Sequence, residues 1–408
     1  HPVRIDIAGT VESIREINAD LLYRCYNEAE DGEDFTGTLT KIHDRFADII
    51  RELGVEFDLE QEIAILKKHL EQNPSPDYMA SRGEYLNSKI IASYLGYTFI
   101  DAAEVIFFQE NGALDEQKTY QTLSMRLMGA DHAVVPGFYG SLPDGTIHTF
   151  SRGGSDVTGA IVARASVSEL YENWTDVSGM LSADPRIVEN PRVIDYITYT
   201  ELRELSYMGA SVLHEDAVFP VRKAGIPINI RNTNAPEDPG TMIVASLPAV
   251  TGRRTVTGIA GKKGFSSIHI EKSMMNGEVG FVAKLLKIFA DEGLSFEHCP
   301  SGIDTISIVI NTASFTPHRD VILHRIRQEL EPDVVAVEDS LALIAVVGQG
   351  MVYSKGTAAR VFAALSGANV NIRMIDQGSS EMNIIGAVAE SDYEEAVRAI
   401  YHEMENLM

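Results

Sequence analysis

The residue types best suited to chemistry gather in one glycine-rich stretch at positions 151–164, S-R-G-G-S-D-V-T-G-A-I-V-A-R. An alternating segment with a turn signal precedes it at 137–150, and a run of small and apolar residues continues it at 160–165. The pattern predicts a strand, a tight turn and a helix, with Ser155 or Asp156 capping the first helical turn.

The predicted turn combines groups that favour a bound anion with one group that does not. Gly153 and Gly154 let the backbone come close to a ligand, and the N–H groups of a helix start attract negative charge. Arg152 adds a planar guanidinium suited to carboxylate or phosphate. The carboxylate of Asp156 beside an anion requires a metal ion or another cation, which favours phosphoryl transfer over passive phosphate binding. A tight turn with a capping aspartate would give the same local pattern.

The overall composition argues against several function classes. The 408 residues carry a formal net charge of −25 at pH 7, which argues against nucleic acid or an anionic membrane as partner. Anionic substrates must therefore be attracted by local arginines, helix ends and bound cations. Cys25 and Cys299 lack metal-ligand spacing, so we predict no protein-bound metal and two reduced thiols in a cytoplasmic protein. No signal peptide is visible, and apolar runs such as 341–347 are too short to cross a bilayer.

Helices and short strands alternate on both sides of the glycine-rich turn. The apolar spacing predicts helices at 20–28, 39–53, 59–70 and 77–95, a break at 36–38, and strands at 96–100, 133–136 and 226–230. This alternation predicts a three-layer α/β/α domain over residues 1–244, with helices on both faces of the sheet. A stretch rich in Pro, Gly, Ser and basic residues at 245–255 is predicted to be a linker.

The rest of the chain contains one pattern twice, with a period of about 70 residues. The order strand, helix, strand, strand, helix, strand (βαββαβ, a ferredoxin-like order) is predicted at 267–270, 279–292, 294–299, 305–311, 317–330 and 333–337. It recurs at 341–347, 356–366, 370–376, 382–388 and 392–405, where the last strand is missing. We predict that 256–261 supplies that strand. The first module then spans 264–338 and is nested in a second module made of 256–263 and 339–408.

Four motifs on these elements resemble those of aspartate kinases: 81–84 (S-R-G-E), 150–156 (F-S-R-G-G-S-D), 174–186 (W-T-D-V-S-G-M-L-S-A-D-P-R) and 227–233 (P-I-N-I-R-N-T). The resemblance covers about residues 19–408, and the C-terminal repeats resemble ACT modules, which bind amino acids. It implies an amino-acid-kinase fold and transfer of the γ-phosphoryl group of ATP to the β-carboxylate of L-aspartate. The product, 4-phospho-L-aspartate, leads to lysine, threonine and methionine. Mg²⁺ would be carried by the nucleotide phosphates.

The resemblance also implies a role for each matching residue. Arg152 would hold the carboxylate of aspartate, and Glu84 would pair with its ammonium group. Asp156 would orient other groups instead of acting as a base, because a carboxylate nucleophile is already ionised at pH 7. The substrate-binding set is completed by Gly153, Gly154 and Ser155, and the ATP-binding set is Thr175, Asp176, Leu181, Arg186 and Asn234, with Asn232 beside it. Without the resemblance, the residues of the ATP-binding set would be interpreted as turn and capping residues, and Glu84 as a solvated glutamate.

Two features depart from the family pattern. Aspartate kinases begin with a strand that ends in Lys-x-Gly-Gly, whose lysine grips the phosphates, and residues 1–19 contain no such motif. Ala19 stands where the family usually has a threonine. Either the sequence lacks part of its N-terminal segment or the enzyme is impaired, and the abrupt start at His1 favours the first. A catalytically inactive amino-acid sensor and a kinase for another acceptor, such as glutamate, are the alternative interpretations.

The first ACT-like module contains a candidate effector site. In such modules the effector lies between the loop before the first helix and the strand after it, here 275–281 and 294–298. The effector-binding candidates are Met275, Gly277, Val279, Ser295 and Glu297. Because a carboxylate at Glu297 would balance the ε-ammonium of L-lysine, we predict feedback inhibition by lysine, with threonine as the alternative. An exposed glutamate at a strand end is the simpler interpretation. The second module is expected to build a homodimer or a dimer of dimers.

Overall fold

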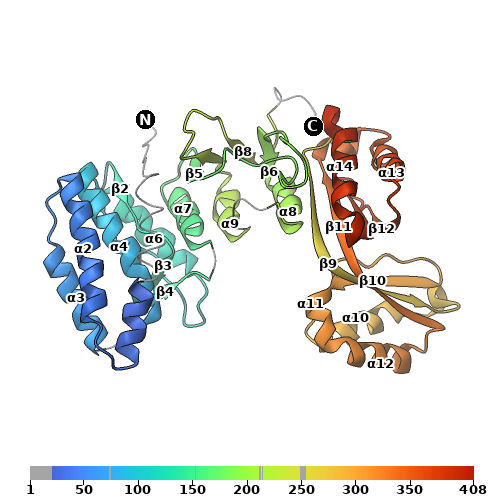
Figure 1. The fold of residues 1–408 in the computed structure, drawn as a ribbon, viewed down its shortest axis with the longest axis horizontal. Coiled ribbons are helices and arrows are strands. Elements are labelled where there is room, and N and C mark those ends of the chain that lie inside the picture. The colour runs from blue at the N-terminus through green and yellow to red at the C-terminus, as the bar shows by residue number, and fades with distance from the viewer. Residues whose placement is uncertain (1–20, 73–74, 152, 211–212, 214, 249–253) are drawn as a thin grey trace. The chain divides into compact units, whose positions relative to one another are not determined.

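A computed structural model describes residues 21–72, 75–151, 153–210, 213, 215–248 and 254–408. The chain divides into two compact units, one made of residues 1–178 and 213–245 and the other of 179–212 and 246–408. Helices and strands alternate in both units, which confirms the predicted α/β class (Figure 1). None of the helices in the described ranges is both long and apolar enough to cross a membrane.

The first unit begins with four neighbouring helices: residues 21–30, α2 (Thr36–Leu53), α3 (Leu59–Gln72) and α4 (Pro76–Leu95). Their apolar faces share one core, in which Ile42, Phe46 and Met79 are fully buried. The break predicted at 36–38 is wrong, because the side chain of Asp34 accepts the Thr36 N–H at 3.0 Å and starts α2 at that point. Cys25 lies in this core, where burial and then Glu28 raise the pKa of its thiol to about 12. Both cysteines are free.

The rest of this unit carries the glycine-rich turn and a small sheet. Its elements are β1 (Thr98–Phe99), α5 (Ala102–Val105), α6 (Glu116–Met128), β2 (Ala133–Val134), β3 (Tyr139–Ser141), β4 (Ile147–Thr149), α7 (Gly154–Ala165), β5 (Tyr171–Thr175), α9 (Glu215–Ala224), β7 (Ile228–Asn232) and β8 (Thr241–Val244). Strand β5 runs parallel to β7, and β8 pairs antiparallel with β7. Helices α7 and α9 pack against each other, and α7 also packs against β5.

The second unit contains the predicted repeats. Its elements are β6 (Tyr196–Thr198), α8 (Tyr199–Tyr207), β9 (Gly258–Glu271), η2 (Met275–Gly277), α10 (Phe281–Asp291), β10 (Thr305–Asn311), α11 (Thr312–Phe315), η3 (Thr316–His318), α12 (Arg319–Leu330), β11 (Val334–Val347), η4 (Gln349–Tyr353), α13 (Thr357–Gly367), β12 (Ile372–Asp376), β13 (Asn383–Ala389), η5 (Glu390–Asp392), α14 (Tyr393–Met404) and η6 (Glu405–Leu407). One five-stranded sheet, in the order β10-β9-β11-β13-β12, runs through both repeats.

Two strands of 14 residues each, β9 and β11, join the two repeats. The strand predicted at 256–261 is present from Gly258, and the first half of β9 pairs antiparallel with residues 341–347 of β11. The second half of β9 pairs with residues 334–338 and with β10. A β-bulge separates the halves of β11. The repeats are therefore nested within one sheet, while their division into domains at 244, 255 and 338 stays a prediction.

The halves of β11 differ in burial because different elements cover them. Residues 334–338 alternate between exposed and half-buried, whereas residues 341–347 are all buried. Ala342, Ile344 and Val346 face the core formed with α13 and α14, and α8 packs against β9 and β11. A strand covered on both faces has a continuous apolar run, which explains the sequence of this segment.

The strand predicted at 294–299 is wrong. This segment makes only isolated antiparallel bridges to β10, at His298–Val309 and Ser301–Ile306. Its side chains are held from elsewhere: the Tyr207 hydroxyl of α8 donates to the Glu297 carboxylate, and His298 Nδ1 lies 2.6 Å from the Asp376 carboxylate at the end of β12. These side-chain contacts fix the segment where regular strand pairing is absent.

A fully buried carboxylate joins α8 to the second repeat. Glu201 is 0% exposed, and its Oε2 accepts the Thr198 N–H and O–H at 2.9 and 2.7 Å, which completes a capping box. Its Oε1 accepts the Thr257 hydroxyl at 2.7 Å and the Gln349 N–H at 2.8 Å. Four neutral donors thus satisfy both oxygens of this carboxylate, which a buried charge requires.

Candidate active site

The glycine-rich turn follows a β-hairpin. Strands β3 and β4 pair with Tyr139 opposite Thr149, and the hairpin closes at Asp144, whose carboxylate accepts the Thr146 N–H and O–H at 2.9 and 2.7 Å. The Phe150 N–H then donates to the Phe138 carbonyl at 2.9 Å. The chain next enters the turn, and α7 begins at Gly154. The predicted order of strand, turn and helix is confirmed.

Gly153 and Gly154 are needed for different reasons. Gly153 is the residue before α7 and has a φ of +56°, in the left-handed region that favours glycine. A Cβ at Gly154 would lie 2.6 Å from the Phe138 Cβ and 3.0 Å from the Phe150 Cβ, so no side chain fits. Among the described residues no side chain caps the start of α7, so the capping predicted for Ser155 or Asp156 is wrong. The first N–H groups of the helix are left for a ligand.

Asp156 points from the first turn of α7 to the small sheet. Its carboxylate accepts the Asn173 amide N–H at 2.9 Å, and Asn173 is a buried residue of β5. The hydroxyl of Tyr171, two residues earlier, donates to the Asp156 carbonyl at 3.2 Å, and burial raises the pKa of this tyrosine. The close approach of α7 to Tyr171 depends on Gly159, because a Cβ there would lie 2.5 Å from the Tyr171 hydroxyl. Asp156 is thus oriented by a neutral amide.

Helix α4, which carries Glu84, is attached to the strand that leads into the turn. It begins with Ser75 as N-cap and Pro76 in its first turn. The two carboxylate oxygens of Asp77 accept the Thr149 N–H at 3.1 Å and the Thr149 hydroxyl at 3.2 Å. Glu84 is half-buried and follows Asp77 by two helical turns, so it lies on the same face of α4, about 10 Å further along. Arg152 lies outside the described residues, as does Ala19.

The carboxyl ends of β5 and β7 bring together residues predicted to bind the nucleotide. Thr175 pairs with Asn232 in the parallel register, and the Thr233 N–H donates to the Thr175 carbonyl at 2.8 Å. The hydroxyl of Thr175 lies 3.2 Å from the Asp176 carboxylate. The Asn234 N–H donates to the side-chain oxygen of Asn232 at 2.9 Å. Ligands of open α/β sheets bind at this end of parallel strands.

Leu181 and Arg186 lie in the second unit, within residues 179–212. Leu181 forms an antiparallel bridge with Val193. The Arg186 guanidinium is paired with Asp184, whose two oxygens accept its Nε–H at 2.9 and 3.1 Å and its Nη2–H at 2.6 Å. The Arg186 side chain is 87% exposed, and these hydrogen bonds lower the pKa of the Asp184 carboxyl. The guanidinium is therefore held in one orientation at the surface of this unit.

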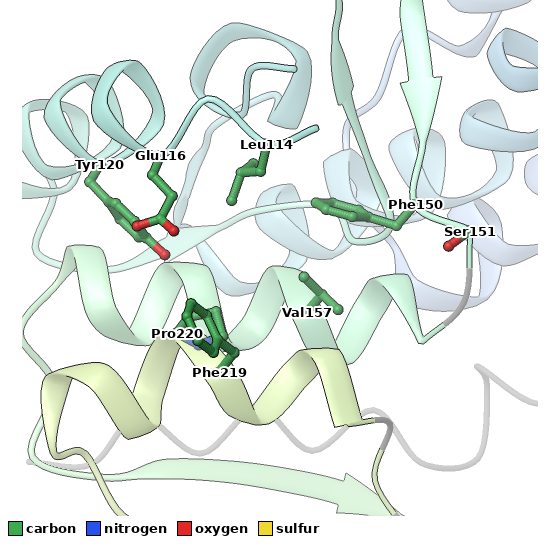
Figure 2. A pocket seen from close by; sticks show the side chains of 8 residues that line it. All are labelled: Leu114, Glu116, Tyr120, Phe150, Ser151, Val157, Phe219 and Pro220. Carbon is green, nitrogen blue, oxygen red and sulfur yellow. The ribbon is translucent and has the colours of Figure 1, made fainter. Parts of the chain in front are cut away.

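A cavity of about 280 Å³ lies next to α7 (Figure 2). It is lined by Leu114, Glu116, Tyr120, Phe150, Ser151, Val157, Phe219 and Pro220, from α6, α7, α9 and the end of the hairpin. Of the lining residues named above, Glu116 is the charged one, and it is 3.2 Å from both Arg164 and Lys223. Burial opposes ionisation of Glu116, but these two cations outweigh it and lower the pKa of its carboxyl. Among the described residues, those that line it include none of the predicted substrate or nucleotide residues.

The candidate effector residues occupy two segments of the second unit. Met275 is buried, Gly277 ends the short helix η2, and the Val279 side chain is 96% exposed. Ser295 is exposed, and Glu297 is half-buried with its carboxylate bonded by Tyr207. The structure thus supplies a neutral partner for Glu297.

Comparison with known proteins shows the family of the chain. The model of the amino acid kinase family matches residues 14–232, more than half of the chain, and an ACT domain model matches residues 344–404. Aspartokinase 3 of Bacillus subtilis is 42% identical over 337 residues, which are 80% of this chain and 74% of that protein. The chain belongs to the aspartokinases.

Solved aspartokinase structures share its fold. The aspartate kinase of Clostridium acetobutylicum is 51% identical, with a TM-score of 0.88 over 95% of this chain and 89% of that one. Escherichia coli aspartokinase III, in complex with aspartate and ADP in the R-state, is 25% identical, with a TM-score of 0.65 over 95% of this chain and 90% of that one. The predicted family and fold are confirmed, and the roles of single residues stay predictions.

Two residues of this aspartokinase were not predicted from the sequence. Both form hydrogen bonds that position the predicted site residues without belonging to the predicted set. Asn173 lies on the same face of β5 as Tyr171 and Thr175, so the period of the strand could have indicated it. Asp77 could only have been interpreted as a first-turn acid of α4, because its partner is 72 residues away.

Asp77 is expected to position Glu84 relative to the turn. The N–H and the hydroxyl of Thr149 go to different oxygens of Asp77, and Asp77→Asn keeps only one of these acceptors, so α4 loses one of its two hydrogen bonds to Thr149. We expect the KM for the amino-acid substrate to rise on the order of 10-fold, the size expected from a charge-assisted hydrogen bond, with a much smaller change in kcat. The measurement is steady-state kinetics at varied amino-acid concentration.

Asp144→Asn is the matched control, because Asp144 accepts the same two kinds of donor, from Thr146 at the other end of the hairpin, through the single oxygen Oδ1 that asparagine keeps. Its KM should stay within about twofold of the unmodified value. Equal increases in the two variants would show that the hairpin as a whole, and not the bond to α4, positions the substrate.

Proposed function

We propose that the chain transfers the γ-phosphoryl group of ATP to the β-carboxylate of L-aspartate and gives 4-phospho-L-aspartate and ADP. The hydrogen bond between Asp156 and Asn173 carries this proposal. It joins the anion-binding start of α7 to β5, whose carboxyl end bears Thr175 and Asp176. A place for a transferring phosphoryl group and a place for a nucleotide are thereby connected through one side-chain contact.

In this reaction the protein contributes by positioning the reactants and stabilising negative charge, more than by transferring protons. A carboxylate oxygen of aspartate attacks the γ-phosphorus, an acyl-phosphate bond forms, and the bond to the β-phosphate oxygen of ADP breaks. The attacking carboxylate is already ionised near pH 7, so no base is needed. The N–H groups at the start of α7 would stabilise charge on the transferring oxygens, and Glu84 would orient the substrate ammonium. Arg152 would hold the α-carboxylate.

Mg²⁺ would enter with the ATP phosphates and neutralise part of their charge. Within the described ranges, no group of three His, Cys, Asp or Glu side chains could hold a metal ion. The residues that would meet the nucleotide are Thr175, Asp176, Asn234, Leu181 and Arg186. This product is expected to supply the synthesis of lysine, threonine and methionine, and we place the activity in the cytoplasm because both cysteines are free.

Replacement of Glu84 by glutamine tests the acceptor assignment. Glu84→Gln keeps the size of the side chain but removes the charge that would pair with the substrate ammonium. We expect kcat/KM for aspartate to fall about 10- to 100-fold, the worth of a charge-assisted hydrogen bond, while the KM for ATP changes little. The measurement is ADP release from ATP, Mg²⁺ and aspartate.

The control is Glu71→Gln, which changes an exposed glutamate near the end of α3. It should match the unmodified chain. No ADP release by the unmodified chain with aspartate would overturn the proposal, and faster release with glutamate than with aspartate would reassign the acceptor.

We further propose L-lysine as a feedback inhibitor that binds the first ACT module. The support is the carboxylate of Glu297, which among the described residues accepts from the neutral Tyr207 hydroxyl, so a cationic side chain would gain a charge-assisted bond there. Because Tyr207 belongs to α8, replacement of its hydroxyl by the lysine ammonium would loosen the 294–298 segment from that helix. Inhibition would follow as a shift between two states of the protein.

Calorimetric titration with lysine tests this assignment. In Glu297→Gln the affinity for lysine should fall about 10- to 100-fold, because the amide offers no charge. Glu331→Gln, at an exposed glutamate after α12, should bind lysine like the unmodified chain. Unchanged lysine affinity in Glu297→Gln would remove lysine as the ligand of this residue, and tight binding of threonine in its place would support the alternative effector.

The proposal includes a homodimer formed through the ACT modules. The sheet leaves β12 as an edge strand, and Ile375 on it is 49% exposed. Unpaired edges and exposed apolar side chains are suited to association with a second copy. Sedimentation equilibrium should give a mass of twice 44.7 kDa or a higher even multiple, and a single-chain mass would contradict it.

A further inference from the structure

Residues 180–194, called the 180–194 hairpin below, form a closed loop in the second unit. Leu181 and Val193 form an antiparallel bridge. The Ser182 N–H donates to the Arg192 carbonyl and the Ile194 N–H donates to the Met180 carbonyl, both at 2.8 Å. At the tip, the Asp184 carbonyl accepts the Ile187 and Val188 N–H groups at 3.0 Å. The hairpin is therefore a structured element that presents Arg186 at its end.

The apolar side chains of this hairpin belong to the core of the second ACT module. Ala183 and Val188 are 4% and 2% exposed, and both lie in one cluster with residues of β9, β11, β13, α13 and α14. Ile187 packs against the same cluster. The amino acid kinase family match covers the hairpin, while the ACT match covers most of that cluster. Packing thus joins residues that the two family matches separate.

Polar contacts fix both arms of the hairpin to the same module. The Ile259 N–H of β9 donates to the Ser182 carbonyl at 2.8 Å. On the other arm, the Arg192 N–H donates to the Tyr401 hydroxyl of α14 at 3.1 Å, and its guanidinium donates to the Met408 carbonyl at 2.6 Å. Tyr401 is 2% exposed, so the first of these bonds is made inside the core. The hairpin cannot shift without breaking contacts to both ends of the module.

The tip of the hairpin holds the Arg186 guanidinium in one orientation. Asp184 orients the Arg186 guanidinium through three hydrogen bonds, and the 87% exposed side chain has N–H groups beyond those that Asp184 engages. A planar guanidinium with remaining donors suits a phosphate oxygen. The position of this group depends on the position of the hairpin.

We propose that the second ACT module sets the affinity for ATP directly, by seating the 180–194 hairpin in its hydrophobic core. Val188, Arg192 and Tyr401 are then positioning residues for the nucleotide, although none of them is itself a nucleotide contact. This rests on the proposed function in one respect, the assignment of Arg186 to the ATP phosphates. The module acts as part of the nucleotide-binding machinery as well as a regulatory domain.

Two valines of the same core provide the test. Val188 of the hairpin and Val361 of α13 are 2% and 3% exposed, and replacement of either by alanine removes the same two methyl groups. Both variants should lose thermal stability by similar amounts. Only Val188→Ala should raise the KM for ATP, on the order of 10-fold, since a small displacement of a phosphate-binding group is enough for this effect. The KM for aspartate should stay unchanged in both.

Tyr401→Phe provides a milder second variant, which keeps the ring in the core and removes only the acceptor of the Arg192 N–H. It should weaken ATP binding in the same direction as Val188→Ala. Equal ATP KM values in the two valine variants would overturn the proposal, as would an unchanged KM in both Val188→Ala and Tyr401→Phe.

Calorimetry with MgADP separates this proposal from the proposed function. Weaker MgADP binding by Val188→Ala than by Val361→Ala supports the role of the hairpin even if the unmodified chain does not phosphorylate aspartate. Absence of MgADP binding by the unmodified chain overturns both proposals. Normal kinase activity with equal MgADP affinities in the two variants overturns only the role of the hairpin.

Discussion

At Gly154 the backbone of α7 approaches the side chains of Phe138 and Phe150 so closely that even a methyl group would overlap them. This contact sets where α7 begins and in which direction it leaves the hairpin. From that start, Asp156 reaches Asn173 on β5, and Gly159 lets Tyr171 pack against the same helix. The candidate site therefore depends on the absence of two side chains as much as on the presence of polar ones.

A second constraint acts in the other unit, where the buried carboxylate of Glu201 accepts four hydrogen bonds from neutral donors of the described residues. Removal of one donor would leave part of a buried charge unsatisfied, at a cost of about 1–3 kcal/mol or more. The donors come from Thr198 at the start of α8, from Thr257 and from Gln349, the first residue of η4. This carboxylate therefore makes α8 move with the second ACT module.

Through the contacts of α8 and of the 180–194 hairpin, the region that packs with the ACT repeats extends beyond the repeats themselves. Residues 179–212 lie within the amino acid kinase match, yet they pack with the ACT repeats. Tyr207 touches Glu297 of the first module, Val188 enters the core of the second, and His298 touches Asp376 between the two. A structural change in either module would therefore act on the same segment, residues 179–212. Such a shared element is the physical requirement for coupling two sites.

The sequence by itself determined the glycine-rich turn, most helices and the repeat, because each depends on local chemistry: glycine spacing, apolar periodicity and capping residues. It also indicated that the segment at 256–261 is a strand, since the second repeat was one strand short. Strand 294–299 was predicted wrongly because its apolar pattern is satisfied by bridges and side-chain contacts instead of a regular ladder. Only the tertiary structure decided that Asp77 meets Thr149, that Glu297 meets Tyr207 and that Val188 lies in an ACT core. The first two contacts join residues 72 and 90 positions apart, and no local pattern encodes which distant partner a side chain will find.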